Sequence, residues 1–465
     1  MHKLRVGYVC CARLSFDGDY AQQLFECSLK SLSRMDVELV HGPGLTVTEE
    51  DAEALAERFH AERVDVILVQ YGTFALGTLI PIFADRLTAP IVLWGVPEPT
   101  LDGPKLRSNS FCGLNMNAHT LMRLGRKYDY IFCGPDEAPA ALASTFRVIH
   151  CLQRLRRVRL GLVGYRVPGF YTSTFDEMGL RRLLGVEVHH VTLAELFDAA
   201  RAVDPARRQA EAAAIRATAA SCEVTTDELD KAGGLMVAFR DIAARDRLTG
   251  FAVKCWPEFT AHYGIMPCST ISRLNDQGLL TACEGDIYGT VSMLMANFLS
   301  GRHAMFADFI AIDDQRNEGL AWHCGSAPTC LMAQGAGNRL GKHATVEGGG
   351  KRGVTVNFPV EGQGPVTMAR LGVGPRGMRL FFVGGQSVPV RANLPGNCWA
   401  VRFETPVRRV VDTVIGQGLE HHTALVHADI RDDLRRLARW LDLETLDVDT
   451  CGSSSPNVLA PATSI

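Results

Sequence analysis

The sequence predicts an α/β protein that ends in an antiparallel β domain. Three observations lead to this prediction. Short apolar strands alternate with helical segments near the N-terminus, the alternation starts again after the basic run at 154–159, and beyond residue 340 glycine-punctuated strands follow one another. The first two patterns are typical of parallel, doubly wound sheets. The third fits an antiparallel barrel or sandwich.

The N-terminal part contains four predicted strands and three predicted helices, one of which follows a turn at Gly72 within the apolar stretch 64–84. In a doubly wound sheet the ligand cleft lies beyond the carboxyl ends of the strands, so Arg13, just after the first strand, is a candidate substrate contact. The glycine-rich loop of a dinucleotide site is absent there, which argues against such a cofactor. The predicted strands are 4–11, 37–41, 64–69 and 91–94, and the other two helices are 20–34 and 49–58.

A second α/β unit begins near residue 154, and the final domain follows it. The second unit has predicted strands at 160–164 and 186–191 and helices at 192–202 and 205–220. The last part has strands at 353–358, 364–371, 377–383 and 399–403, then a helix at 429–441. The expected domains are therefore 1–154 (α/β), 155–299 (α/β), 300–450 (with the β-barrel) and a disordered tail, 451–465, rich in Ser, Pro and Ala.

Composition favours a small-molecule partner and a cytoplasmic location. The 465 residues include 48 Lys and Arg against 51 Asp and Glu, so no basic surface for nucleic acid is indicated. The 14 cysteines are scattered without paired CxxC spacing, which indicates reduced thiols. No signal peptide is recognisable, and the longest apolar stretch, 64–84, contains Asp65 and Gln70, so no membrane span is expected.

Two carboxylates and two histidines are the candidates for catalysis. Glu284 follows an apolar strand, and Asp308 comes after a helical segment at 287–299 and a further short strand. A strand–helix–strand unit can bring two such carboxylates together, where they can bind a cation and move a proton. His323 ends another strand, and His422 begins a late one. This oxygen-rich set favours Mn²⁺ over Co²⁺ or Zn²⁺, although isolated residues of these types more often cap turns or face water.

Two further residues could contact a substrate. Trp256 and Glu258 lie just upstream of the candidate site and could line a polar pocket, although Trp256 is equally compatible with a place in the core.

Five short motifs occur in the order expected for one known family. With them the chain resembles the L-fucose/L-arabinose isomerase superfamily, and most closely its fucose-isomerase-like branch. The motifs are Lys254-Cys255-Trp256-Pro257-Glu258, Cys283-Glu284-Gly285-Asp286, Ala307-Asp308, 322–328 (WHCGSAP) and His421-His422-Thr423.

The resemblance implies a fold, a reaction and a set of site residues. The fold is two doubly wound α/β domains and a C-terminal antiparallel β-barrel, in a homo-oligomer that is commonly a hexamer. The reaction is a Mn²⁺-dependent aldose–ketose isomerisation. Glu284 and Asp308 match the carboxylate ligands that also transfer protons, and His422 matches the late histidine ligand. His323 is either a ligand or a substrate contact.

The expected reaction passes through an enediol formed by proton transfer beside a polarised carbonyl. The substrate is a monosaccharide: a deoxy sugar, a pentose or a modified hexose. Arg13 and other basic residues permit an anionic sugar, but a surface arginine is the simpler explanation. Two alternatives remain: a cytosolic sugar-binding or regulatory protein that lost the chemistry, and a metal-dependent epimerase.

Overall fold

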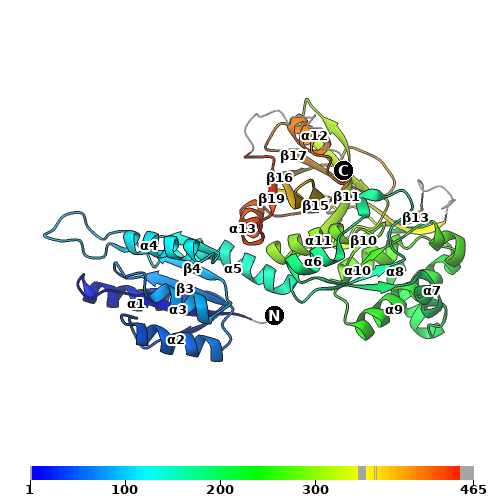
Figure 1. Ribbon diagram of the computed structural model, residues 1–465. Helices are drawn as coiled ribbons and strands as arrows, with labels where there is room; N and C mark the ends of the chain where they lie inside the picture. The colour runs from blue at the N-terminus through cyan, green and yellow to red at the C-terminus, as the bar shows by residue number, and fades with distance from the viewer. Residues whose placement is uncertain (1–2, 344–351, 361, 363, 451–465) are drawn as a thin grey trace, which may run out of the picture. The chain divides into compact units, whose positions relative to one another are not determined.

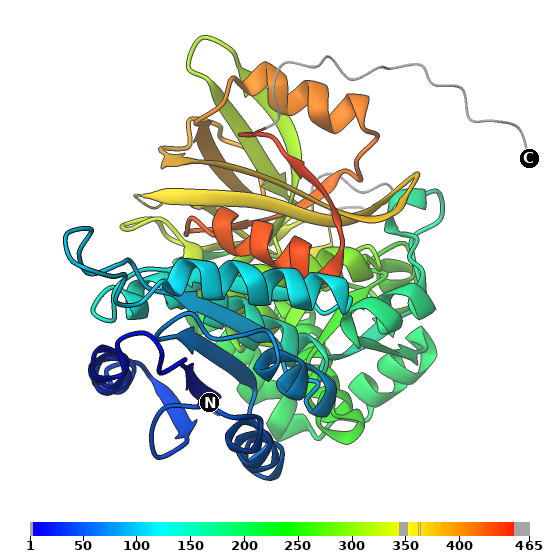
Figure 2. The same ribbon diagram turned by 60° about the vertical axis from the view of Figure 1, so that its left-hand side comes forward.

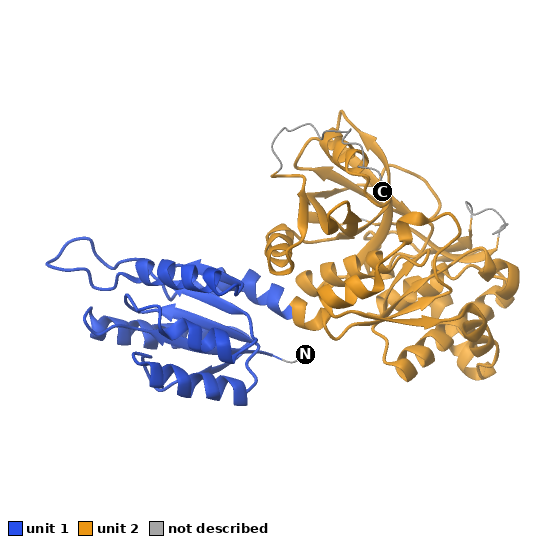
Figure 3. Cartoon of the chain, in the orientation of Figure 1, with its two compact units in different colours: residues 1–150 blue, residues 151–465 orange. Residues whose placement is uncertain are grey.

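The structure is a computed structural model that describes residues 3–343, 352–360, 362 and 364–450. The chain divides into two compact units, residues 1–150 and 151–465 (Figure 3). The predicted tail at 451–465 lies outside the described residues. Within those residues, no helix combines the length and the apolar character that crossing a bilayer requires.

Unit 1 is built on a parallel five-stranded sheet in the order β2-β1-β3-β4-β5 (Figure 1). Four of its strands were predicted. The fifth, β5, alternates buried with more exposed positions at the sheet edge, and one of the buried positions holds Asp129, so its apolar pattern is weak. The strands are β1 (Leu4–Cys11), β2 (Val37–His41), β3 (Val66–Tyr71), β4 (Ile91–Gly95) and β5 (Tyr128–Phe132). The helices are α1 (Gly18–Leu32), α2 (Glu49–Ala61), α3 (Leu79–Arg86), α4 (Ser110–Arg123) and α5 (Ala138–Leu155).

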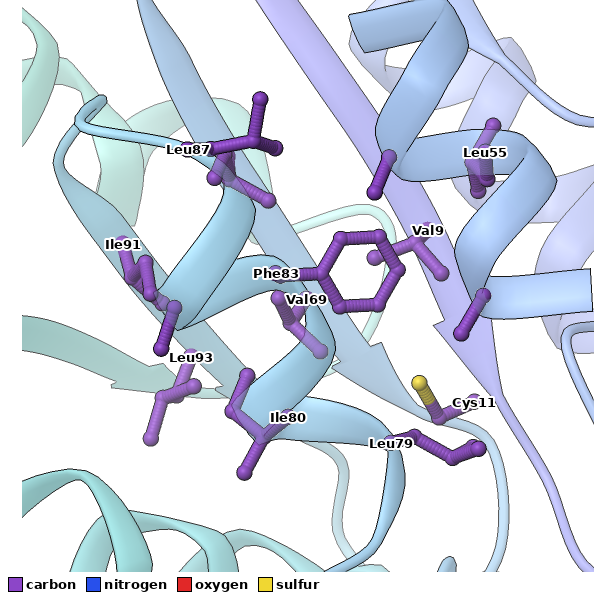
Figure 4. Close-up of a cluster of buried hydrophobic side chains, with 14 of the residues drawn as sticks. Val9, Cys11, Leu55, Val69, Leu79, Ile80, Phe83, Leu87, Ile91 and Leu93 are labelled. Carbon is purple, nitrogen blue, oxygen red and sulfur yellow. The ribbon is translucent and has the colours of Figure 1, made fainter. Parts of the chain in front are cut away.

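Helices cover both faces of this sheet, which explains why its central strands β1, β3 and β4 are almost entirely buried. On one face, Leu55 of α2 and Phe83 of α3 pack on Val9 and Val69 (Figure 4). On the other face, Phe25 of α1 and Phe146 of α5 belong to a second buried cluster. Each fully buried side chain of this size contributes about 1.5–3 kcal/mol to folding.

Unit 2 begins with a second parallel sheet, in the order β10-β9-β6-β7. Val163, Val253 and Cys283, which end three of its strands, are aligned in register. The residues that follow these strands therefore come out at one edge of the sheet. The strands are β6 (Arg159–Val163), β7 (Glu187–Val191), β9 (Gly250–Val253) and β10 (Leu280–Cys283). The helices are α6 (Glu177–Leu184), α7 (Leu193–Arg201), α8 (Pro205–Ala217), α9 (Thr226–Asp246), α10 (Cys268–Asp276) and α11 (Ile287–Ser300).

The C-terminal part of unit 2 contains a closed antiparallel barrel, rather than a sandwich. The order β16-β15-β18-β11-β12-β17 closes because β17 also pairs with β16. Helix α13 (Arg431–Leu441) packs against β16 (Figures 1 and 2). The barrel strands are β11 (Ala304–Asp313), β12 (Glu318–His323), β15 (Pro365–Gly374), β16 (Gly377–Val388), β17 (Asn397–Phe403) and β18 (His422–Val426). Strands β8 (Ser221–Cys222), β13 (Arg339–Lys342), β14 (Gly353–Val360) and β19 (Glu444–Asp447) extend the sheet, and α12 (Val407–Gly416) follows β17.

The barrel changes one expectation about the site. Asp308 does not lie on a strand beside β10, because β11 belongs to the barrel and β10 to the parallel sheet. It also lies in the middle of its strand and not at an end. The two carboxylates therefore reach each other from different sheets.

Candidate active site

Glu284 lies at a sharp turn where β10 leaves the parallel sheet. Its φ is 63°, a left-handed conformation that costs a residue with a side chain about 1–3 kcal/mol. Gly285 follows with a φ of 72°, and a Cβ there would lie 2.1 Å from the carbonyl oxygen of Tyr165. Only glycine therefore fits after Glu284. The turn directs the Glu284 carboxylate toward the barrel, with 14% of the side chain exposed.

Asp308 and His422 are partners across two strands of the barrel. They stand opposite each other in the antiparallel pairing of β11 with β18, so their side chains share one face. Phe306, two residues before Asp308 on the same face, packs on the His422 ring with 4.3 Å between ring centroids. The sheet register thus fixes both functional groups beside a rigid aromatic contact.

Glu284, Asp308 and His422 converge at one point. Nε2 of His422 lies 2.9 Å from Oε2 of Glu284 and 3.6 Å from Oδ1 of Asp308. All three atoms are buried, yet none has an aligned hydrogen-bond partner among the residues that the structure describes. Buried polar atoms without partners are costly unless something else satisfies them. Two carboxylate oxygens and one imidazole nitrogen suit a divalent cation.

His421 is a further candidate ligand at this point. Its Nε2 lies 3.7 Å from Oε2 of Glu284 and 4.0 Å from Oδ1 of Asp308. Ligand atoms of Glu284, His421 and His422 all lie within 4.8 Å of one another. The Nδ1 of His421 lies 2.8 Å from the hydroxyl of Thr172. Sequence reasoning noted His421 only as part of a motif and gave it no role.

His422 is oriented by a buried pair of opposite charges. Its Nδ1 lies 2.9 Å from Oδ2 of Asp286, whose two oxygens also accept hydrogen bonds from Arg370 at 2.7 and 3.1 Å. Asp286 is held further as the N-cap of α11, where it accepts from the Gly289 backbone N–H. Because Asp286 is ionised, Nδ1 of His422 donates its proton to that carboxylate, and Nε2 is the ring nitrogen that faces the site and can bind a cation once it has lost its own proton. Carboxylates often hold metal-binding histidines in this way.

These orienting residues were not predicted, although two sequence signals point to them. Arg370 is a single charged residue in an otherwise apolar strand, 366–373, and a buried arginine needs a carboxylate partner. Asp286 stands at the start of an apolar helix, where aspartate usually caps the first turn. Nothing in the sequence shows that the two signals concern the same ion pair.

The charges around the site set the protonation of its groups. Burial alone would raise the pKa of Glu284, but His421 and His422 lower it overall. Burial also opposes ionisation of Asp286, but Arg370 and His422 keep its pKa below the usual value. Burial disfavours the charged form of His422, yet Asp286 and Glu284 raise its pKa to about 9. Glu284 and Asp286 are therefore anionic at neutral pH: Glu284 as a cation ligand must be, and Asp286 as the partner of Arg370 and His422.

The segment that follows β6 covers this site from one side. The Phe170 ring contacts both His421 and Trp256, with centroid distances of 5.4 and 5.7 Å. Nε1 of Trp256 and Oε2 of Glu258 are buried without hydrogen-bond partners in the described part of the chain. Buried donors and acceptors of this kind are suited to sugar hydroxyl groups.

His323 lies beside the ring of His422, farther from the point where Glu284, Asp308 and His422 converge. Its ring centroid is 6.1 Å from that of His422, and Nδ1 lies 3.1 Å from the hydroxyl of Ser326. Burial lowers the pKa of His323, so it is neutral. Arg13 belongs to unit 1, where its exposed side chain follows β1. The structure thus brings together Glu284, Asp308 and His422, with His323 nearby.

One family model matches the N-terminal part of the chain, and several known proteins match nearly its whole length. The family model described as "Fucose/sulfoquinovose isomerase, N-terminal domain" matches residues 7–149. A sulfoquinovose isomerase from Alkalicoccus urumqiensis is 30% identical over 449 residues, which cover 96% of this chain and 100% of that protein. Sulfoquinovose isomerases from Priestia megaterium and Clostridium sp. are 28% and 26% identical, each covering 96% of this chain and 99% of its own length.

Among solved structures, a periplasmic solute-binding protein from Actinobacillus succinogenes with bound D-allose matches with a TM-score of 0.18. The two chains are 14% identical, and the match covers 60% of this chain and 84% of the solute-binding protein. A likeness at this level carries no conclusion about fold or function.

Proposed function

Because the chain belongs to the fucose-isomerase-like branch of the L-fucose/L-arabinose isomerase superfamily, we propose that it is a Mn²⁺-dependent aldose–ketose isomerase for a sulfonated monosaccharide. The chain is a sugar isomerase, since its full-length relatives carry that activity in their names. The metal and the sulfonated substrate are our proposals. The observation that best supports them is the convergence of buried, unpartnered atoms of Glu284, Asp308 and His422.

Glu284, Asp308 and His422 are the residues that would hold the cation, with His421 as a fourth candidate. When bound there, the ion supplies a Lewis acid that polarises the sugar carbonyl. Asp286 and Arg370 keep Nε2 of His422 aimed at the site. The oxygen-rich ligand set is the reason for proposing Mn²⁺ rather than a softer metal.

Glu284 and Asp308 are the residues that exchange protons with the sugar. Their carboxylates approach the same point from two sheets, so one can remove a proton from carbon while the other serves oxygen. Proton return to the neighbouring carbon converts aldose to ketose. Trp256, Glu258 and His323 are the proposed contacts for the sugar hydroxyls, which is supported by the unpartnered polar atoms of Trp256 and Glu258 and by the nearness of the His323 ring to His422. Arg13 remains a proposed substrate contact from unit 1.

Arg166 is the proposed contact for the acidic group of the substrate. Its Cα lies 2.9 Å from where a Cβ on Gly285 would stand, so it is next to the turn that carries Glu284. Its guanidinium lies over the ring of Tyr171 at 4.9 Å, and its Nε is buried without a partner in the described residues. A guanidinium can bind a sulfonate through paired hydrogen bonds, as it binds carboxylates and phosphates.

Replacing Arg166 by methionine is expected to weaken the use of a sulfonated hexose selectively. The loss of a charged hydrogen bond costs about 1.5–3 kcal/mol, or about 10- to 100-fold in kcat/KM. Steady-state assays with sulfoquinovose and with uncharged glucose measure the selectivity. The matched control is Arg182→Met, because Arg182 is an exposed arginine on α6. This variant should leave kcat/KM unchanged for both sugars. An equal loss for both sugars in Arg166→Met would contradict a role in anion binding.

Removing divalent cations is expected to abolish isomerisation. Protein dialysed against EDTA should be inactive, and added Mn²⁺ should restore turnover better than Ca²⁺, which prefers a larger shell of oxygen ligands. The assay is ketose formation from sulfoquinovose, with bound metal measured by mass spectrometry. Full activity in protein that contains no metal would overturn the cation proposal. We further propose that the enzyme is a homo-oligomer, as the family resemblance implies, and that it is cytoplasmic, as its scattered, reduced cysteines favour.

A further inference from the structure

A second group of possible metal ligands lies outside the carboxylate site. The Sγ atoms of Cys268 and Cys324 and one ring nitrogen of His343 all lie within 4.8 Å of one another. Cys268 and His343 are buried, Cys324 is half-buried, and both cysteines are free thiols. No residue of this group belongs to the set that holds the proposed Mn²⁺.

Three separate elements bring these residues together. Cys268 begins α10, Cys324 directly follows β12, and His343 directly follows β13. The segment before α10 is fixed to β14 by two backbone hydrogen bonds between Met266 and residues 353 and 354. A Cβ on Gly325 would lie 2.8 Å from Cβ of Thr355, so the loop of Cys324 also lies closely against β14. The ligand positions are thus supported by regular structure, as a metal site requires.

The donor atoms differ in kind from those of the carboxylate site. Two sulfurs and one imidazole form a soft set, which selects Zn²⁺ or Cu⁺ over Mn²⁺. Two thiolates also neutralise a divalent ion completely, and a buried site favours zero net charge. A monovalent ion would leave one negative charge. The set therefore suits Zn²⁺, with three protein ligands and one open position, as in known Cys₂His zinc sites.

We propose that Cys268, Cys324 and His343 bind a zinc ion at a site separate from the proposed Mn²⁺ site. On binding, each thiol loses its proton to solvent, two Zn–S bonds form, and the imidazole donates a lone pair. No oxidant or reductant takes part. This binding does not depend on the proposed isomerase function, because its ligands and its spectroscopic signal are its own.

The zinc site is connected to the substrate side of the active site through His323. Sγ of Cys324 lies 3.4 Å from Nδ1 of His323, and the His323 ring is 6.1 Å from that of His422. A zinc ion that binds the Cys324 sulfur removes its thiol proton, so Cys324 can then only accept a hydrogen bond from His323 and can no longer donate one. Zinc bound there is therefore positioned to change sugar binding while the Mn²⁺ ligands stay in place.

Cobalt titration of the metal-free full-length protein tests the proposal. Co²⁺ reports thiolate ligands through a sulfur-to-cobalt charge-transfer band, which oxygen and nitrogen ligands do not produce. We expect this band to develop with Co²⁺ and to disappear when one equivalent of Zn²⁺ is added. In Cys268→Ser and in Cys324→Ser the band should weaken, and the affinity should fall by more than about tenfold, since changes even behind the ligands cost that much.

Cys398→Ser is the matched control, because Cys398 is a buried free thiol on β17 outside the group. The charge-transfer band of the Cys398→Ser variant should equal that of the unchanged protein. Zinc-edge X-ray absorption of the unchanged protein, loaded with one equivalent of Zn²⁺, should show sulfur ligands at about 2.3 Å and needs no variant to fold. Absence of sulfur from the zinc shell, or a cobalt band that survives both cysteine substitutions, would overturn the proposal. Either result would leave the proposed Mn²⁺-dependent isomerisation untouched, because that proposal is tested by turnover and not by thiolate ligands.

Discussion

Replacing Glu284 by glutamine is expected to remove isomerase activity while the fold stays intact. Glutamine has the same size and tolerates the φ of 63° no worse than glutamate, so the turn is preserved. It cannot take up a proton as a carboxylate does, and its amide is a weaker ligand for a cation. The loss of general acid–base catalysis alone lowers kcat by about 10²- to 10⁴-fold. Turnover of sulfoquinovose with saturating Mn²⁺ measures the effect.

The control for this substitution is Glu404→Gln on the barrel surface. Glu404 is exposed and pairs with Arg431, which also pairs with Asp429 and Asp449, so Glu404 should be dispensable for turnover. Circular dichroism and thermal unfolding of both variants separate lost chemistry from lost structure. Near-normal turnover in folded Glu284→Gln would remove Glu284 from the catalytic pair, and with it the mechanism proposed for the site.

Replacing Arg370 by methionine is expected to cause the largest loss of stability among single changes near the site. The Arg370 and Asp286 side chains are only 0% and 1% exposed, and they share two hydrogen bonds. Methionine leaves the Asp286 carboxylate buried without its main counter-charge. Breaking a buried ion pair in this way costs about 3–5 kcal/mol. Urea unfolding monitored by fluorescence measures the change in the free energy of unfolding.

A surface ion pair of the same barrel provides the comparison. Arg376 pairs with Glu444, but its side chain is 79% exposed, so Arg376→Met should cost less than about 1 kcal/mol. The double variant Asp286→Asn with Arg370→Met should recover part of the stability, because the buried charge is gone. It should not recover metal affinity, since His422 then lacks the carboxylate that orients it. Equal stability losses at Arg370 and Arg376 would contradict a buried, essential pair.

The general architecture could be predicted because its signals are local. Apolar runs of strand length, separated by helical patterns, gave four of the five strands of the first sheet. Glycine-punctuated alternation after residue 340 predicted an antiparallel end domain, and β16 pairing with both β15 and β17 makes it a closed barrel. Barrel and sandwich have the same alternation along each strand. Which two strands pair to close the barrel depends on long-range contacts, and the alternation of residues along a strand does not determine it.

The site was predictable as a set of residues but not as a geometry. Glu284, Asp308 and His422 were identified by motif, and the structure brings their functional atoms together. The expectation that Asp308 sits at a strand end next to β10 was wrong, because its partner is His422 in the barrel. Arg370 is 84 positions from Asp286 in the sequence, so only the fold reveals that the two share hydrogen bonds.

Proton NMR of the reaction in D₂O tests the central proposal most directly. Sulfoquinovose incubated with Mn²⁺-loaded protein should give the corresponding ketose, with solvent deuterium entering the carbon that carries the transferred proton. An epimerase would instead give a second aldose. A hydride shift would give the ketose without deuterium. Appearance of the deuterated ketose, and its absence in Glu284→Gln and after EDTA, is the result that the carboxylate pair predicts. Conversion that retains the original proton, or no conversion of any sugar in the presence of Mn²⁺, would contradict it.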